Sequence, residues 1–227
     1  MVSIGVVIGV RDREKPVENC ARLSTIDTLH MVLVEQGNVS RFSKTPCDSY
    51  IFIHTSDMWN KSRSNNAGLD SLPDTLDKVM LLDGDLFLSN EDIDILCKLP
   101  KNVVYILHAD DSSIHTGNIL LPKEIALRYD ERLAGWGWDD VDFLLRILKE
   151  GYVVNHFQLQ SSVYIDEDVP QKRLDVRPGC ASPLENNYIN TIISLNDLRS
   201  PCNGSIEERA SIEWTKILNL PTYDGGK

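Results

Sequence analysis

The chain has 227 residues, of which 42% are hydrophobic and 25% charged, with a formal charge of −11 and an isoelectric point near 4.9. This composition is that of an ordinary globular domain, and it excludes a disordered tail, a collagen-like chain and a coiled coil. The acidity also argues against nucleic acids and anionic membranes as partners, because binding to phosphates requires clustered Lys and Arg.

Cysteines and apolar runs indicate where the protein resides. The five cysteines are odd in number and lack C-x-x-C spacing, so neither a zinc site nor a disulfide framework is expected. No apolar run reaches the ~18 residues of a transmembrane segment, and Ser3–Val10 lacks the basic leader and cleavage site of a signal peptide. We expect a cytoplasmic protein, or a domain of a longer one.

Segments typical of strands alternate with helical ones along the chain. The apolar run Ser3–Val10 predicts a strand buried on both faces, and Pro16 suits the first turn of a helix towards Leu23. Further strands are expected at His30–Glu35, Ser49–His54, Lys78–Leu82, Asn102–Leu107 and Asn118–Leu121. A helix is expected over Lys123–Tyr129.

Three further helices are expected towards the C-terminus. Apolar residues at helical spacing predict one over Asp139–Glu150, ended by Gly151. Asn187–Leu198 is the second, and a capping box at Ser205 begins the third. Residues 155–185 show no regular pattern. The alternation of strands and helices predicts an α/β fold whose mostly parallel central sheet is flanked by helices.

Polar segments follow three expected strands, namely Arg11-Asp12-Arg13, Asp83-Gly84-Asp85 and Asp110-Asp111. Ligands of parallel sheets bind beyond the carboxyl ends of the strands, so these segments should converge at one edge. The carboxylates of Asp83 and Asp85 have the oxygen ligands that Mg²⁺ and Mn²⁺ prefer. The alternative is a turn with solvated acids, since other Asp-x-Asp triplets begin at Asp92, Asp140 and Asp166.

The segment Gly135-Trp136-Gly137-Trp138-Asp139-Asp140 is the second candidate. Its glycines permit a tight turn, and tryptophan faces stack on sugar rings. The two aspartates fall in the first turn of the expected helix, where the dipole favours anions. A carboxylate there can act as a general base towards a sugar hydroxyl. The competing interpretation is a buried aromatic turn with an aspartate cap.

Two weaker candidates could serve a nucleotide. Arg11 and Arg13 can hold a diphosphate and Asp12 a base or ribose, although this segment taken alone is better explained as a polar loop with a local salt bridge. In Trp59-Asn60-Lys61-Ser62, the aromatic ring suits a base and the lysine a phosphate, but the segment also reads as the start of a helix.

The order of these motifs resembles the inverting GT-A glycosyltransferases, and most of all the β-1,4-galactosyltransferase and chondroitin-synthase-like group. The shared pattern covers about residues 3–152, and it also includes Val34-Glu35-Gln36 and His115-Thr116-Gly117-Asn118. The resemblance implies a GT-A (Rossmann-like) fold in a single domain over 1–227. Its nucleotide-binding half would span 1–100, and its acceptor half with the C-terminal helices 101–227.

The activity that the resemblance implies is a metal-dependent transfer of sugar from a nucleotide-sugar, expected to be a UDP-sugar, to a glycan hydroxyl with inversion. The cofactor would be Mn²⁺ or Mg²⁺. The residues implied to bind the nucleotide-sugar are Arg11, Asp12, Arg13, Trp59, Lys61, Asp83 and Trp136.

The resemblance also implies which residues carry the chemistry. Asp140 would be the general base, and Asp139, which stands where the group usually has Glu, would hold the acceptor or donor sugar. Asp83 and Asp85 would ligate the metal. The group has a metal-binding histidine downstream of its acid pair. His156 is the only histidine downstream of the acid pair in this chain, so the resemblance implies that it would be the third metal ligand.

Three alternatives stay open. Related retaining transferases of this fold also carry a W-G-x-E/D segment. A sugar-phosphate nucleotidyltransferase shares the sheet and the carboxylates, but it would carry a glycine-rich loop after the first strand, and Arg11–Lys15 contains no glycine. A non-catalytic sugar-binding domain could keep the fold, although this chain retains both acid pairs.

Overall fold

The structure is a computed structural model, and it describes residues 3–56, 58–109, 116–135, 137–165, 180 and 183–199. The strands are β1 (Ile4–Val10), β2 (Leu29–Gly37), β3 (Ser49–His54), β4 (Lys78–Leu82), β5 (Leu86–Phe87), β6 (Val104–His108), β7 (Ile119–Pro122), β8 (Val154–Gln158) and β9 (Val163–Tyr164). The helices are α1 (Lys15–Leu23), α2 (Lys61–Ser71), α3 (Asn90–Lys98), α4 (Asp139–Lys149) and α5 (Pro183–Arg199).

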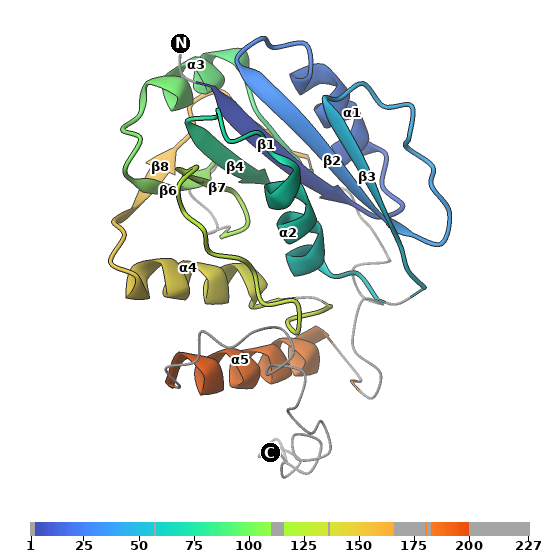
Figure 1. Ribbon diagram of the computed structural model, residues 1–227, viewed down its shortest axis with the longest axis vertical. Coiled ribbons are helices and arrows are strands. Elements are labelled where there is room, and N and C mark those ends of the chain that lie inside the picture. Colours follow the sequence, from blue (N-terminus) through green and yellow to red (C-terminus); the bar gives the residue numbers. More distant parts are fainter. Residues whose placement is uncertain are drawn as a thin grey trace.

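A seven-stranded sheet with the order β3-β2-β1-β4-β7-β6-β8 forms the centre of the molecule (Figure 1). Only β7 runs antiparallel to its neighbours β4 and β6, and the other pairs are parallel. The predicted α/β fold with a mostly parallel sheet is therefore confirmed. Strands β1, β4 and β6 all end at one edge, which we call the carboxyl edge. Asp110 and Asp111 lie outside the described residues.

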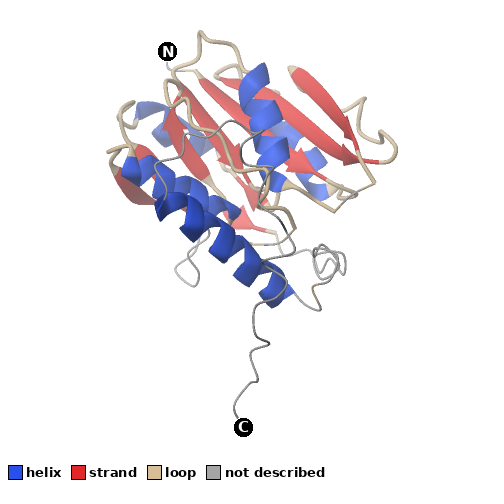
Figure 2. Cartoon of the chain, turned by 60° about the horizontal axis from the view of Figure 1, so that its bottom comes forward, coloured by secondary structure: helices blue, strands red, loops and turns tan. Residues whose placement is uncertain are grey.

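Helices cover both faces of this sheet (Figures 1 and 2). On one face, Cys20 and Leu23 of α1 and Ile93 and Leu96 of α3 join the core, and on the other face α2 and α4 do so. Helix α2 lies directly on β1, because a Cβ added at Gly68 would stand 2.2 Å from the side chain of Val7. Helix α5 packs on α4 (Figure 1), so it is a further layer on that face.

The predicted helix over Lys123–Tyr129 is wrong. The chain makes a turn at Lys123 and then continues without regular structure to Asp130. Asn66 of α2 explains why, because its Oδ1 accepts the backbone N–H of Tyr129 at 2.8 Å and its Nδ2 donates to the carbonyl of Tyr129 at 3.0 Å. Helix α2 thus takes the backbone groups that a local helix would need. The helix predicted from Ser205 lies outside the described residues.

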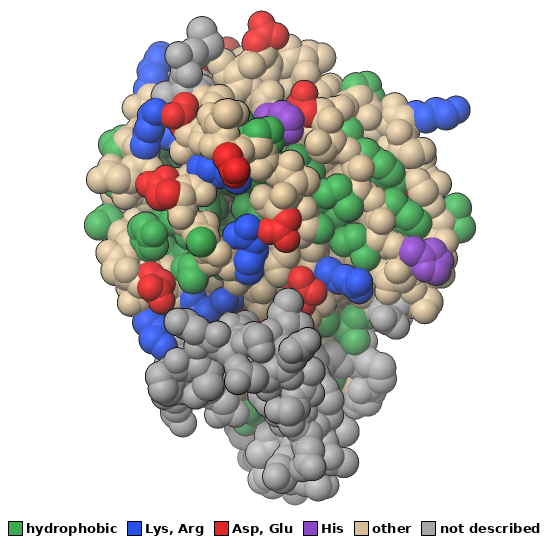
Figure 3. Space-filling model, in the orientation of Figure 1, with side chains coloured by type: hydrophobic (Ala, Val, Ile, Leu, Met, Phe, Trp, Pro, Cys, Tyr) green, Lys and Arg blue, Asp and Glu red, His purple; other side chains and the backbone are tan. Residues whose placement is uncertain are grey.

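The surface mixes charges of both signs. Acidic and basic side chains are interspersed over the face of the molecule seen in Figure 3. Within the described part of the chain, no helix combines the length and apolarity that crossing a bilayer requires.

Lys78, the first residue of β4, ties helix α3 to the sheet. Its side chain is buried, and Nζ donates to the carbonyl oxygens of Leu96 at 2.8 Å, Cys97 at 3.2 Å and Leu99 at 2.7 Å. The last carbonyls of a helix lack partners within the helix, and the helix dipole favours a cation there. The buried ammonium therefore caps α3 from the neighbouring strand.

We expect Lys78→Met to lower the free energy of unfolding by about 2–4 kcal/mol in urea denaturation. The substitution keeps the length of the side chain but leaves buried carbonyls without a donor, at about 1–3 kcal/mol for each unsatisfied group. Removal of the buried charge offsets part of the loss. The control is Lys149→Met in the last turn of α4, where the lysine is exposed and the change should stay within about 0.5 kcal/mol. Equal stability of the two variants would contradict the capping role of Lys78.

Candidate active site

Two acidic segments meet at Lys61, the first residue of α2. Lys61 Nζ lies 2.5 Å from Oδ1 of Asp83 and 2.8 Å from Oδ2 of Asp140. Asp83 follows β4, and Asp140 stands in the first turn of α4. The side chains of Lys61 and Asp140 are only 17% and 15% exposed. The two motifs predicted to carry chemistry thus share one site at the carboxyl edge.

The start of α2 is clamped to β2. Asn60 caps the helix by accepting the N–H of Arg63 at 2.9 Å. The amide of Gln36, near the end of β2, donates to the carbonyl of Asn60 at 2.5 Å and accepts its N–H at 3.2 Å. The neighbouring Trp59 lies against β1, since a Cβ at Gly9 would be 3.0 Å from its ring. These contacts fix where Lys61 projects.

The segment before β7 shapes the place of Asp83. The backbone N–H of Asp83 donates to Oδ1 of the fully buried Asn118 at 2.8 Å, and Asn118 in turn donates to the Tyr164 hydroxyl at 3.3 Å. A Cβ added at Gly117 would lie 2.0 Å from Oδ2 of Asp83. Glycine at this position therefore makes the room that the carboxylate occupies.

Asp85, the second acid of the same triplet, faces a cation from the segment after β1. Its Oδ2 lies 3.9 Å from the guanidinium of Arg13, and both side chains are mostly buried. Asp12 pairs instead with Arg41 at 3.0 Å. The expected convergence of the segments after β1 and β4 is therefore present. Each carboxylate of the triplet has a positive charge beside it.

The acid pair occupies two different environments. Asp140 accepts a hydrogen bond from the Tyr129 hydroxyl at 3.2 Å in addition to that from Lys61, and Tyr129 stacks on Phe143 at 4.1 Å. Asp139 is 6% exposed, and no described residue donates to its buried Oδ2. Burial, and next the carboxylate of Asp140, raise the pKa of Asp139, which Lys61 opposes. Burial also raises the pKa of Asp140, and Lys61 opposes this effect as well.

Strained backbone coincides with the motifs. Among the described residues, the non-glycine residues with positive φ are Asp12 at 53° and Trp138 at 69°. Gly135 and Gly137 beside Trp138 also have positive φ, at 73° and 99°. Such conformations cost about 1–3 kcal/mol for a residue with a side chain, and they persist where the surroundings impose them, often at functional sites.

The structure does not bring His156 to the two aspartates. His156 lies on β8, where its Nδ1 is 2.7 Å from Nε2 of His108 and the two rings stack. Strands β7 and β6 separate β8 from β4, about 14 Å at the usual spacing of strands. Accordingly, the described part of the chain contains no group of three or more His, Cys, Asp or Glu side chains able to hold a metal ion. Trp136 lies outside the described residues.

The triplet that begins at Asp92 has a structural role. The buried Asp92 carboxylate accepts the backbone N–H groups of Gln160, Ser161 and Ser162 at 2.8–3.0 Å. These bonds anchor the segment that leads to β9. The Asp92 carboxylate is therefore engaged by backbone donors, and the second acid of this triplet, Asp94, is exposed.

Three contributors to the site had no role assigned from the sequence: Gln36, Asn118 and Tyr129. Gln36 and Asn118 are the last residues of Val34-Glu35-Gln36 and His115-Thr116-Gly117-Asn118, two motifs on which the resemblance depends. Their membership of these motifs could have identified them as site residues. Tyr129 had no such signal, because it lies in the segment that was expected to be a helix.

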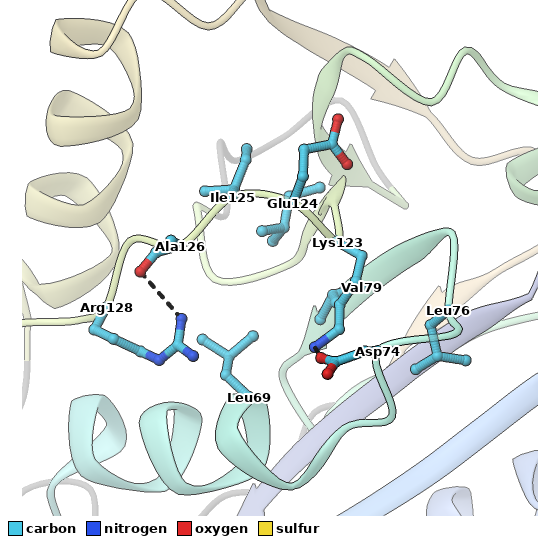
Figure 4. Close-up of a pocket in the computed structure, with 10 residues that line it drawn as sticks. Leu69, Asp74, Leu76, Val79, Lys123, Glu124, Ile125, Ala126 and Arg128 are labelled. Atoms are coloured by element: carbon cyan, nitrogen blue, oxygen red, sulfur yellow. Dashed lines mark hydrogen bonds and ion pairs between the residues drawn. The ribbon is translucent and has the colours of Figure 1, made fainter.

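A separate cavity of about 410 Å³ lies at the opposite edge of the sheet. Leu76 and Val79, next to the start of β4, line it together with Lys123, whose Nζ is 3.8 Å from Asp74 (Figure 4). Because Asp83 follows the other end of β4, this cavity does not belong to the candidate active site.

Comparison with solved structures identifies proteins of similar fold. No protein-family model and no curated protein sequence matches the chain. The catalytic domain of Drosophila β1,4-galactosyltransferase 7 in complex with xylobiose superposes with a TM-score of 0.58 at 18% identity, covering 82% of this chain and 79% of that one. A variant of the same enzyme in complex with manganese, UDP-Gal and xylobiose gives the same values. A mycobacterial protein also reaches 0.58, at 10% identity, with 86% and 74% covered.

The chain therefore has the GT-A glycosyltransferase fold. This confirms, at the level of the fold, the resemblance that the order of the motifs indicated.

We expect Lys61→Met to lower the free energy of unfolding at pH 7 by about 2–4 kcal/mol in urea. Loss of one partner from a buried ion pair costs about 3–5 kcal/mol, and partial exposure of Asp83 reduces this value. Lys15→Met, which breaks an exposed pair with Glu18, is the control and should change stability by at most about 1 kcal/mol.

The double variant Lys61→Met/Asp140→Asn should regain part of the lost stability, because it removes one of the carboxylates left without a cation. A Lys61→Met protein as stable as the wild type would show that this charge cluster does not form.

Proposed function

We propose that the chain is a metal-dependent glycosyltransferase, which moves a sugar from a nucleotide-sugar, expected to be a UDP-sugar, to a glycan hydroxyl with inversion. The observation that carries this proposal is the junction at Lys61, which joins Asp83 to Asp140 at the carboxyl edge of a GT-A sheet. Ligands of such sheets bind at this edge. The complex of a structural neighbour with manganese, UDP-Gal and xylobiose supports the choice of substrate class.

Asp83 and Asp85 are the residues that would hold Mn²⁺ or Mg²⁺. Their donor set fits, since Mg²⁺ is commonly bound by one or two carboxylates together with substrate phosphates. When bound, the cation would neutralise negative charge on the leaving diphosphate.

The nucleotide would lie between the segments after β1 and before α2. Arg13, which stands beside Asp85, and Arg11 would contact the diphosphate and base, with Asp12 at the base or ribose. Trp59 and Lys61 would flank the uridine and the phosphates. An ammonium already placed between two carboxylates can shift its contacts towards a phosphate over a short distance.

Asp140 would act as the general base. Its two oxygens are oriented by separate donors, Lys61 and Tyr129, so the carboxylate has a fixed direction. In the proposed step, Asp140 accepts the proton of the acceptor hydroxyl while that oxygen bonds to the anomeric carbon and the diphosphate leaves from the opposite side. Asp139 would hold the acceptor or donor sugar, and Trp136 would line the sugar site.

Binding of UDP should require a divalent cation, because its negatively charged diphosphate enters a site with several carboxylates. Calorimetry should show UDP binding with Mn²⁺ that disappears with EDTA. Asp85→Ala should weaken the affinity for UDP in the presence of Mn²⁺ at least about tenfold, which corresponds to about 1.4 kcal/mol of binding free energy. The control is Asp94→Ala, an exposed acid of the triplet that begins at Asp92, which should bind as the wild type does. Equal affinity with Mn²⁺ and with EDTA would refute the metal site.

Asp140→Asn should reduce transfer by about 10²–10⁴, the usual contribution of a positioned base. Asparagine keeps the shape but cannot take the proton, so binding of UDP with Mn²⁺ should stay within a few-fold. Rates come from steady-state assays with a panel of UDP-sugars and glycan acceptors.

Two results would count against this assignment. Near-normal transfer by Asp140→Asn would assign the base to Asp139 or another acid, and collapse of UDP binding would make Asp140 a ligand of the metal or nucleotide. A product with retained anomeric configuration would exclude the single displacement.

A further inference from the structure

Helix α5 presents a polar stripe to the segment that carries the acid pair. Asn186, Asn190 and Ser194 recur every fourth residue, so they share one face of the helix, and all three are fully buried. Buried polar side chains of this kind are found where they have hydrogen-bond partners. The partners of this stripe lie in the turn before α4 and in the first turn of α4, beside which α5 lies (Figures 1 and 2).

A single amide closes that turn. Asn190 Nδ2 donates to the carbonyl of Gly137 at 2.6 Å and to the carbonyl of Ala134 at 3.3 Å. Asn186 also donates to Ala134, at 3.1 Å. Because the two carbonyls belong to residues three apart, the Asn190 amide holds both sides of the turn at once.

The contacts on either side of Asn190 extend the same support. A Cβ added at Gly137 would lie 2.6 Å from Oδ1 of Asn187, so α5 approaches the backbone of the turn closely. One turn further along α5, Ser194 donates to Oδ1 of Asp142 at 2.7 Å. Helix α5 therefore contacts both the turn before α4 and the first turn of α4, which contains Asp139 and Asp140.

The turn needs this support because the backbone of Trp138 is strained. Trp138 directly precedes Asp139, and its positive φ of 69° is unfavourable for a residue with a side chain, whereas Gly135 and Gly137 adopt positive φ without that cost. From the other side, the N–H of Gly135 donates to the carbonyl of Trp59 at 2.9 Å. The turn is thus held between the segment before α2 and helix α5, and loss of either anchor lets the strained backbone relax.

We propose that Asn190 is a positioning residue of the transferase site: its amide holds the backbone of Ala134 and Gly137 in the conformation that directs Asp140 towards Lys61 and the acceptor. This inference rests on the proposed function. It extends the site to a helix beyond residues 3–152, the range that the family motifs cover.

The first test measures the turn itself and does not depend on activity. Asn190→Asp keeps the size of the side chain, but a carboxylate cannot donate to carbonyls and repels them, whereas Asn190→Ala removes the group. Hydrogen–deuterium exchange of peptides covering residues 134–142 should become at least about tenfold faster in both variants, a change of about 1.4 kcal/mol in opening. Tyr188→Ala, at an exposed position of the same helix, is the matched control and should leave exchange unchanged.

The second test separates positioning from a purely structural role. With UDP-Gal, Mn²⁺ and xylobiose as probes, or the best pair from the panel, kcat of Asn190→Asp should fall about 10–100-fold, as expected from a misplacement of about 1 Å. The KM for the donor and the affinity for UDP with Mn²⁺ should stay within twofold. Tyr188→Ala should retain the wild-type kcat.

The outcomes are distinct. Unchanged exchange over 134–142 in Asn190→Asp overturns the proposal, and so does faster exchange with an unchanged kcat. A wild-type protein that turns over none of the panel counts against the proposed function, whereas the exchange experiment still decides whether Asn190 holds the turn.

Discussion

The candidate site depends on one buried cation. The carboxylates of Asp83, Asp139 and Asp140 gather at the carboxyl edge, and their mutual repulsion in a partly buried place would drive them apart without a positive charge between them. Lys61 supplies that charge, and the acids in turn raise its pKa well above the usual value although burial acts in the opposite direction. Gln36 and Asn60 hold the start of α2 in place, so they fix the position of Lys61. They therefore also influence the positions of the carboxylates that Lys61 binds.

The sequence predicts those parts of the fold whose cause is local. Strand β4 and helix α4 lie within a residue of their expected limits. The short apolar run indicates a buried strand, and the apolar stripe at helical spacing indicates an amphipathic helix. Helix α2 shows no such stripe. It buries Ser62, Asn65 and Asn66, whose polar groups face loops and strands that only the folded chain brings near.

For the site, the sequence indicates the chemical groups but not their pairing. The acids and cations were expected at one edge, which follows from strand direction alone. That Lys61 would bridge Asp83 and Asp140, and that His156 would stand beside His108, depends on strand order and side-chain reach. In the sequence, Asn190 belongs to a pattern of polar residues at every fourth position, Asn186, Asn190 and Ser194. A search for periodic apolar residues does not detect this pattern.

The antiparallel direction of β7 has a consequence for how the chain can vary. Strands β1 and β4 offer the residues that follow them to the site, whereas β7 offers those that precede it, Gly117 and Asn118. The connection from His108 to Gly117 thus begins and ends at the carboxyl edge of the sheet. Insertions there would fall beside the candidate site, whereas insertions after Pro122 would fall at the opposite edge, next to Lys123 and the separate cavity.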